Sequence, residues 1–455
     1  MAHEERPTDA VDGGSLGDRI GGLMGRARDD LSTLLAFPSV ADPRQFPVTG
    51  CRQAADFVAR SFAGAGLPDV RILDTPDGHQ AVFGQCPGPP DSPTVLLYSH
   101  YDVQPPLDDK AWASPPWELT ERGGRWYGRG AADCKGNIVA QLTALRAIQG
   151  WLRVGVKVIS EGSEEQSTGG LAALIRDQPS LLRADAVLVC DAGNVRVGQP
   201  TLVSSLRGVV HATVTVRALV SPVHSGNFGG PTPDPVIALI QMLASLHDEK
   251  GNTTIAGLRA AGEWEGPQYP ARQYRSDAGI LPGVDLVGAG TIADMLWASP
   301  ALTVTGIDIP PVVGSTPAIQ AEVRAKINLR LPHGTDAAEA SRALAAQLRR
   351  AAPWNVEVDV TELSRSQPFH SPAGGPGYTR LAAAMRDAFG QEPVRAGLGG
   401  SMPTCQALAE TYPEAEIVLL GVEEPRCLIH APNESVDPSE IEKTALALAL
   451  FLIGD

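Results

Sequence analysis

Five short segments of this chain each end an apolar stretch with a side chain that can bind a metal ion. Parallel sheets hold their ligands directly after buried strands, so this pattern constrains both the fold and the site. Histidines and carboxylates in these numbers are typical of a hydrolytic centre with two metal ions and a general base. The side chains that the segments supply are His100, Asp102, Asp133, Glu164, Glu165, Asp191 and His430.

The size and charge of the chain narrow its class. Its 455 residues are too many for one hydrophobic core, so we expect about two or three domains. A formal net charge of −15 and a pI near 5.1 disfavour nucleic acid and anionic membranes as partners. Residues 1–15 show no signal pattern, and the apolar run Ala445–Ile453 is too short to cross a bilayer. Six scattered cysteines are typical of reduced thiols, which predicts a cytoplasmic protein.

Strands and helices alternate in the first 205 residues. The apolar runs Val95–Ser99, Val154–Ser160 and Ala186–Cys190 are typical of strands that are buried on both faces. Helical spacing at Asn137–Ile148 and Thr168–Leu182 predicts right-handed crossovers and a mostly parallel sheet. The candidate ligands would then lie at the carboxyl ends of the strands, where such sheets bind ligands.

After residue 205 the pattern changes to a strict alternation of apolar and polar residues. Ile319–Leu331 is apolar at every odd position, and the segment 210–216 is apolar at every even position. Such strands have one wet face and usually pair antiparallel. With helices at Pro235–His247 and Ala337–Ala351, the order is strand, helix, strand, strand, helix, strand. This order suggests an inserted ferredoxin-like domain that acts as a lid or a dimerisation surface.

An α/β pattern returns after residue 365. A helix is expected at Tyr378–Phe389, a strand at Ile417–Leu420 and a helix at Pro438–Leu452. We therefore predict an α/β catalytic domain in two segments, 1–205 and 366–455, around an α+β insertion at 206–365. His430, beyond the insertion, would then return to the site of the first segment.

The segments with the candidate ligands, and several others, also match the sequence motifs of a known family. They are Ser99–Pro105, Tyr127–Gly136, Glu161–Glu165, His224–Gly226, Asn328–Pro332, Gly399–Pro403 and Ile429–Glu434. With these segments the chain resembles the carnosinase-type dipeptidases of the dinuclear-zinc aminoacylase and carboxypeptidase superfamily. The match extends from about residue 95 to about residue 435, and Asp-Val-Gln after the first histidine favours the dipeptidase branch. The resemblance implies a zinc-exopeptidase-like fold and a metallopeptidase that hydrolyses dipeptides.

The resemblance also implies a role for each ligand. Asp133 would be the carboxylate that bridges two divalent metal ions, which lie about 3.5–4 Å apart in such sites. His100 and Asp191 would complete one metal shell, and Glu165 and His430 the other. Asp102 would orient the His100 imidazole, and Glu164 would act as the general base. Zinc is the first expectation for the metal, with manganese or cobalt as alternatives.

Three further residues are implied for substrate binding. His224 would reach across a homodimer to the substrate carbonyl, Arg330 would bind the terminal carboxylate, and Ser401 would lie on a loop that helps to hold it. In isolation each residue also has a plainer interpretation, respectively a loop histidine, a surface salt-bridge arginine and a Gly-rich turn.

Two alternatives remain at the level of function. An N-acyl-amino-acid amidohydrolase would use the same metals and base, whereas a catalytically silent homologue would serve as a dimeric binding protein. The sequence also departs from the family at Cys134, where a second acid usually follows the bridging aspartate. Cys134 either shifts metal preference or oxidation sensitivity, or it is a neutral replacement.

Overall fold

A computed structural model describes residues 13–258, 262–371 and 374–454 of the chain. Within these residues two compact units are present. Unit 1 runs to Ser204 and resumes at 371–396 and 407–454, and unit 2 comprises 205–370 and 397–406. The segment 397–406, which contains Ser401, thus belongs to unit 2, whereas the sequence-based division has it in 366–455.

A nine-stranded sheet forms the centre of unit 1, in the order β1-β2-β6-β3-β7-β17-β8-β15, with β16 paired to β8. The four central strands β6, β3, β7 and β17 are parallel, and their residues are buried almost throughout. The strands on either side run antiparallel to their neighbours, so the expected parallel sheet is the middle of a mixed one. The bounds are β1 Asp69–Asp74, β2 Gln80–Cys86, β3 Thr94–His100, β6 Gly155–Glu161, β7 Ala186–Cys190, β8 Thr201–Leu206, β15 Phe369–His370, β16 Val394–Leu398 and β17 Glu416–Leu420.

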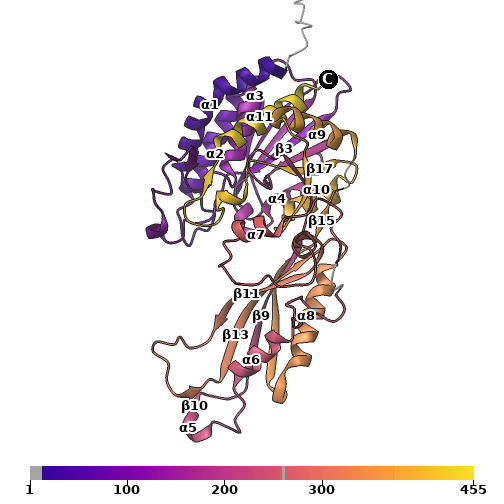
Figure 1. Cartoon of the computed structure of the whole chain (residues 1–455). Coiled ribbons are helices and arrows are strands. Elements are labelled where there is room, and N and C mark those ends of the chain that lie inside the picture. The colour runs from indigo at the N-terminus through magenta and orange to yellow at the C-terminus, as the bar shows by residue number, and fades with distance from the viewer. Residues whose placement is uncertain (1–12, 259–261, 372–373, 455) are drawn as a thin grey trace, which may run out of the picture. The chain divides into compact units, whose positions relative to one another are not determined.

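Helices cover this sheet and bury its apolar side chains (Figure 1). Right-handed crossovers place α3, between β3 and β6, and α4, between β6 and β7, on opposite faces, because the two connections run in opposite directions along the sheet. Capping marks the start of α11, where Asp437 accepts a hydrogen bond from the Ser439 N–H and Pro438 occupies the first turn. The bounds of the helices are α1 Gly13–Leu35, α2 Thr49–Gly64, α3 Lys135–Ala147, α4 Gly170–Asp177, α9 Pro376–Phe389, α10 Pro403–Thr411 and α11 Pro438–Ile453.

A small three-stranded sheet joins segments that are about three hundred residues apart in the chain. In it β18 pairs with β5, so that Ser435 lies opposite Tyr127. The loop before α3 and the segment after His430 are therefore held side by side. The strands are β4 Thr120–Arg122, β5 Arg125–Tyr127 and β18 Ser435–Val436.

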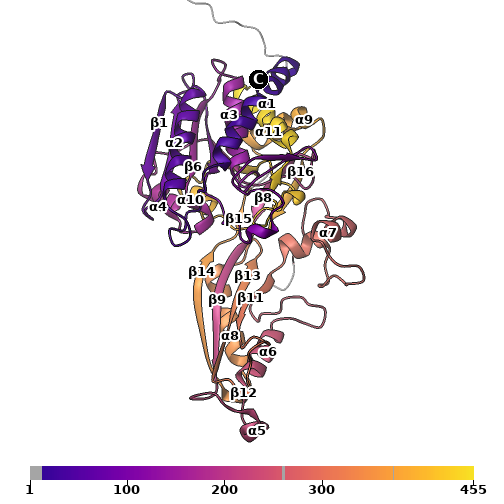
Figure 2. The ribbon, with the colours of Figure 1, turned by 90° about the vertical axis from the view of Figure 1, so that its left-hand side faces the viewer.

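Unit 2 contains a four-stranded antiparallel sheet in the order β11-β13-β9-β14 (Figure 2). The chain order β9, α6, β11, β13, α8, β14 is the ferredoxin-like one that the alternation predicts. Val210, Val214 and their neighbours turn to a core with α6 and α8, and polar residues occupy the other face. The bounds are α5 Ser225–Phe228, α6 Pro235–Ala244, α7 Ala271–Asp277, α8 Ala337–Ala351, β9 Gly208–Arg217, β10 Val223–His224, β11 Ala301–Asp308, β12 Ala318–Ile319, β13 Glu322–Leu331 and β14 Glu357–Ser366.

Two elements differ from the sequence prediction. The helix expected at Thr168–Leu182 is only α4, Gly170–Asp177, because a residue before proline avoids the helical region and Pro179 follows Gln178. The single strand expected at Ile319–Leu331 is divided at residues 320–321, and its first part pairs with β10 instead of β9. Among the described residues, no helix has the length and apolar character that spanning a membrane requires.

Candidate metal centre

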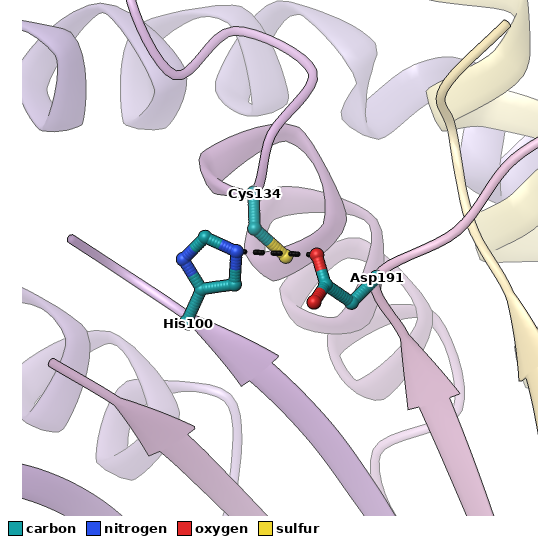
Figure 3. Close-up of side chains that lie close together, drawn as sticks. All are labelled: His100, Cys134 and Asp191. Atoms are coloured by element: carbon teal, nitrogen blue, oxygen red, sulfur yellow. Dashed lines mark hydrogen bonds and ion pairs between the residues drawn. The ribbon is translucent and has the colours of Figure 1, made fainter. Parts of the chain in front are cut away.

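His100 and Asp191 meet at the carboxyl edge of the parallel strands. His100 is the last residue of β3, and Asp191 directly follows the neighbouring strand β7. The Nε2 atom of His100 lies 3.1 Å from Oδ1 of Asp191 and 3.0 Å from Oδ1 of Asp133. Figure 3 shows the His100 ring and the Asp191 carboxylate facing one another, with the Cys134 thiol close to both. A ring nitrogen with two carboxylate oxygens is a ligand set suited to a divalent metal.

Asp133 is held in place by a buried carboxylate from the far end of the chain. Its backbone N–H donates to Oε1 of Glu434, and so does the N–H of Ala132. The second oxygen of Glu434 accepts from the Gly130 N–H and from Arg129. The pairing of β18 with β5 brings Glu434 next to the Asp133 loop. The loop has no regular secondary structure, and these hydrogen bonds fix its position.

A second group of ligands forms around the other oxygen of Asp133. Nε2 of His430 lies 2.9 Å from Oδ2 of Asp133 and 3.2 Å from Oε2 of Glu165. The Glu165 carboxylate also accepts hydrogen bonds from the backbone and the side chain of Gln104. His430 has a φ of 60°, a left-handed conformation that is uncommon outside glycine. Such strained residues are enriched at functional sites.

Asp102 connects the two ligand groups. Nδ1 of His100, the nitrogen opposite the one that faces Asp133, lies 3.0 Å from the backbone carbonyl oxygen of Asp102 and 3.4 Å from its carboxylate. The Asp102 carboxylate also accepts the backbone N–H groups of Glu164 and Glu165, at 3.1 and 3.0 Å. One buried aspartate therefore orients both the histidine and the turn that carries the glutamate pair.

Glu164 begins a short 3₁₀ turn, Glu164–Gln166, beyond β6. Burial raises the pKa of its carboxyl well above the ordinary value, and the charge of Asp191 raises it further. A raised pKa makes a carboxylate a stronger base, which suits a group that must accept a proton.

Burial and neighbouring charges shift the pKa values of the histidines and carboxylates in this cluster. Although burial alone lowers the pKa of His430, hydrogen bonds to Asp133 and Glu165 raise it to about 11. Burial acts to raise the pKa of Asp133, but hydrogen bonds from His100 and His430 bring it below its usual range. Burial raises the pKa of Asp191 and Glu165, which face further carboxylates. So many acids in one buried place require cations to balance them.

The residues fit a pair of metal ions. Ligand atoms of Asp133, Glu165 and His430 all lie within 4.8 Å of one another, and so do those of Asp133, Asp191 and Glu423. A third such group combines His100, Cys134 and Asp191. Asp133 belongs to two of these groups, so its carboxylate is in a position where two metal ions could share it. The Asp133–Cys134 peptide bond is cis.

Glu423 is a candidate ligand that the sequence reasoning missed. It is buried, its Oε1 atom has no hydrogen-bond partner, and burial raises its pKa well above the ordinary value. A signal was present, since Glu423 follows the parallel strand β17 as Asp191 follows β7. Glu434, which holds the Asp133 loop, was noted only as part of a family segment.

The structure thus brings seven of the ten expected site residues into one cluster in unit 1. The other three lie in unit 2, on separate elements. His224 ends β10 with its ring exposed, Arg330 lies near the end of β13, and Ser401 precedes α10. The Gly226 N–H donates to Nδ1 of His224, which leaves Nε2 to carry the ring proton.

A mixed α/β sheet with candidate metal ligands at its strand ends fits a metal-dependent hydrolase. The chain matches the model of peptidase family M20/M25/M40 over residues 96–453, and it belongs to that family. The expectation of a metallopeptidase is therefore confirmed.

Individual relatives agree with this assignment. The chain is 43% identical to the cysteinylglycine-S-conjugate dipeptidase of Corynebacterium striatum over 88% of its own length and 89% of the relative's. It is 27% identical to the beta-Ala-His dipeptidase of Rattus norvegicus over 85% of its length and 81% of that protein. The fold is similar to the crystal structure of human carnosine dipeptidase 1, with a TM-score of 0.83, 24% identity, and coverage of 98% of this chain and 99% of that one.

Proposed function

We propose that this protein is a dipeptidase in which two divalent metal ions share Asp133 and Glu164 is the general base. The observation that carries the proposal is the position of Asp133, which has one oxygen beside His100 and the other beside His430. His100 and Asp191 would hold one ion, and Glu165 and His430 the other. Zinc suits this mixture of imidazole and carboxylate ligands, and manganese or cobalt are the alternatives.

The metal ions and the protein side chains would have different roles in the reaction. The ions, when bound, would make a water molecule nucleophilic at neutral pH and polarise the scissile carbonyl. Glu164 would take the proton of that water and deliver it to the leaving amine, which a raised pKa favours. Asp102 would keep His100 and the Glu164 turn in position through its hydrogen bonds.

The substrate would be a small peptide with a free carboxylate. The relative in Corynebacterium striatum is named for cysteinylglycine S-conjugates, and dipeptides of that type are the first substrates to test. Arg330 would bind the terminal carboxylate, with Ser401 and the glycines before it on the neighbouring loop.

We further propose a homodimer in which His224 serves the active site of the partner subunit. Its exposed ring carries the proton on Nε2, so it can donate a hydrogen bond to the oxygen of a carbonyl under attack. All six cysteines are free thiols, which supports a reducing compartment such as the cytoplasm.

Turnover assays with controlled metals test the proposed activity. Purified protein freed of metal and reloaded with Zn²⁺, Mn²⁺ or Co²⁺ is given cysteinylglycine, beta-Ala-His and N-acetyl amino acids, and bound metal is measured alongside. Hydrolysis of dipeptides with two ions per subunit is expected. Hydrolysis of N-acetyl amino acids alone would identify an amidohydrolase instead. Protein that binds two ions and turns over none of these substrates would contradict the proposed activity.

A further inference from the structure

Two arginines lie together on the polar face of the sheet in unit 2. Arg330 of β13 lies opposite Val209 of β9, and paired residues in antiparallel strands point to the same face. Arg207 directly precedes β9 and is two residues before Val209, so continuing the alternation of the strand would place it on that face as well. It is a diagonal neighbour of Arg330, within the reach of a long side chain.

A glycine-containing loop fixes the position of Arg207. The backbone N–H of Arg207 donates to the carbonyl of Leu398, at 3.2 Å. A side-chain carbon built on Gly399 would lie 3.0 Å from Nη2 of Arg207. The guanidinium group therefore lies along the loop that also carries Ser401.

Neither arginine has a counter-charge within the part of the chain that the structure describes. Both are partly buried, and Nε of Arg207 is inaccessible to solvent and has no hydrogen-bond partner. By contrast, Arg217 at the other end of β9 pairs with Glu322 at 2.5 Å, and Arg324 of β13 pairs with Asp308 at 2.7 Å. Partly buried cations without partners are costly unless a ligand supplies the negative charge.

The surroundings add to this unbalanced positive charge. Burial, together with the positive charge of Arg330, lowers the pKa of Arg207 to about 10. His211 and Asn328 lie opposite one another on the same face, and each has a buried polar atom without a hydrogen-bond partner. In a chain with a formal net charge of −15, this is a local excess of cations with unsatisfied polar atoms beside it.

Aromatic rings border the same loop. A side-chain carbon on Gly397 would lie 2.7 Å from the Trp297 ring, so the end of β16, directly before the loop, lies against that ring. Trp297 is stacked with Tyr269 and packs edge-on against Trp264 at 5.0 Å between ring centroids. The Tyr274 ring packs against Tyr269. These rings offer a surface for an apolar, aromatic or thioether group beside the arginines.

We propose that Arg207 joins Arg330 in a subsite of unit 2 that binds one carboxylate between two guanidinium groups, with the Trp297 ring cluster taking an apolar group of the same ligand. On the proposed function this carboxylate is the free terminus of the dipeptide, so Arg207 makes a free carboxylate a requirement for substrates. Two arginines give the carboxylate more donors, and a more fixed orientation, than one can.

A binding measurement tests the subsite without any turnover. The probes are 4-phenylbutyrate, which has a carboxylate and a ring but no scissile bond, and its uncharged amide. Calorimetry with the wild-type protein should show tighter binding of the acid than of the amide. Arg207→Gln should weaken binding of the acid about 10- to 100-fold and leave the amide unchanged, and Arg207→Lys should recover part of the loss. Arg217→Gln is the matched control, because Arg217 already has acidic partners.

The kinetics separate this subsite from the proposed activity. With a dipeptide that the wild-type protein hydrolyses, Arg207→Gln should raise KM by a similar factor and leave kcat nearly unchanged. Equal binding of acid and amide by the wild type, or an Arg207→Gln protein with unchanged melting temperature that binds the acid normally, overturns the subsite. Acid-selective binding without turnover of any dipeptide would instead keep the subsite and reject the dipeptidase.

Discussion

Asp102 is a residue that contacts both groups of candidate metal ligands. It is fully buried and faces Nδ1 of His100, while its two oxygens accept the backbone N–H groups of Glu164 and Glu165. One carboxylate thus contacts a proposed ligand of one metal ion, the turn with a proposed ligand of the other, and the proposed base.

Replacing Asp102 with asparagine should therefore impair both metal binding and catalysis. The amide keeps the shape of the side chain but presents only one acceptor oxygen, so one of the two backbone bonds is lost. We expect a fall of about 10- to 100-fold in metal affinity or in kcat/KM, measured by metal titration and by dipeptide turnover. Asp108→Asn, at an exposed turn, is the control and should leave both unchanged. Normal metal affinity and turnover in Asp102→Asn would show that Asp102 does not position the site.

At the scale of residues, the sequence predicts candidate ligands at strand ends, and it misses a candidate that only its three-dimensional neighbours reveal. His100 and Asp191 stand at strand ends that hydrophobic runs reveal. Glu423 also follows a strand, but Gly421 and Val422 separate it from the end of that strand, and it lies in none of the family-like segments. Its role as a candidate becomes visible only when Asp133 and Asp191 are found beside it.

At the scale of elements, the loop before α3 depends on the short pairing of β18 with β5. Glu434 lies just before β18 and accepts four hydrogen bonds, from Arg129 and from the backbone of Gly130, Ala132 and Asp133. Both members of the Arg129–Glu434 pair are buried. Removing one charge of such a pair leaves the other buried and unpaired.

Glu434→Gln should consequently lower the free energy of unfolding by about 3–5 kcal/mol, measured by urea denaturation of metal-free protein. Glu121→Gln is the control, because Glu121 and Arg28 form an exposed pair at 3.7 Å. Its loss should change the unfolding free energy by no more than about 1 kcal/mol. Similar small effects of the two substitutions would contradict the structural role of Glu434.

Element boundaries follow the sequence where one local preference dominates and depart from it where tertiary pairing decides. The helix α8 begins and ends where the apolar spacing predicts, and Asp336 caps its first turn. The parallel centre of the large sheet was predicted from runs buried on both faces. Its antiparallel edges were not, since the direction of a strand depends on its connection and on its partner rather than on its composition.

At the scale of the whole molecule, the proposed dimer makes a prediction about shared active sites. If His224 serves the partner subunit, mixing His224→Ala with Glu164→Gln protein creates heterodimers with one complete site. Random exchange should then restore about a quarter of wild-type activity, although each variant alone is nearly inactive. The measurement is dipeptide turnover after subunit exchange, with exchange verified by differently tagged subunits. No recovery in verified heterodimers would place His224 in the site of its own subunit, and an active His224→Ala protein would place it outside the site.

The most direct test of the two-metal dipeptidase is the Glu164→Gln protein, assayed beside the wild type for bound metal and for kcat on cysteinylglycine. The substitution removes the proposed base but no proposed ligand. We expect two metal ions per subunit in both proteins and a kcat about 10²–10⁴-fold lower in the variant. A Glu164→Gln protein that keeps wild-type kcat would contradict the account, and so would a loss of activity explained by a lost metal ion.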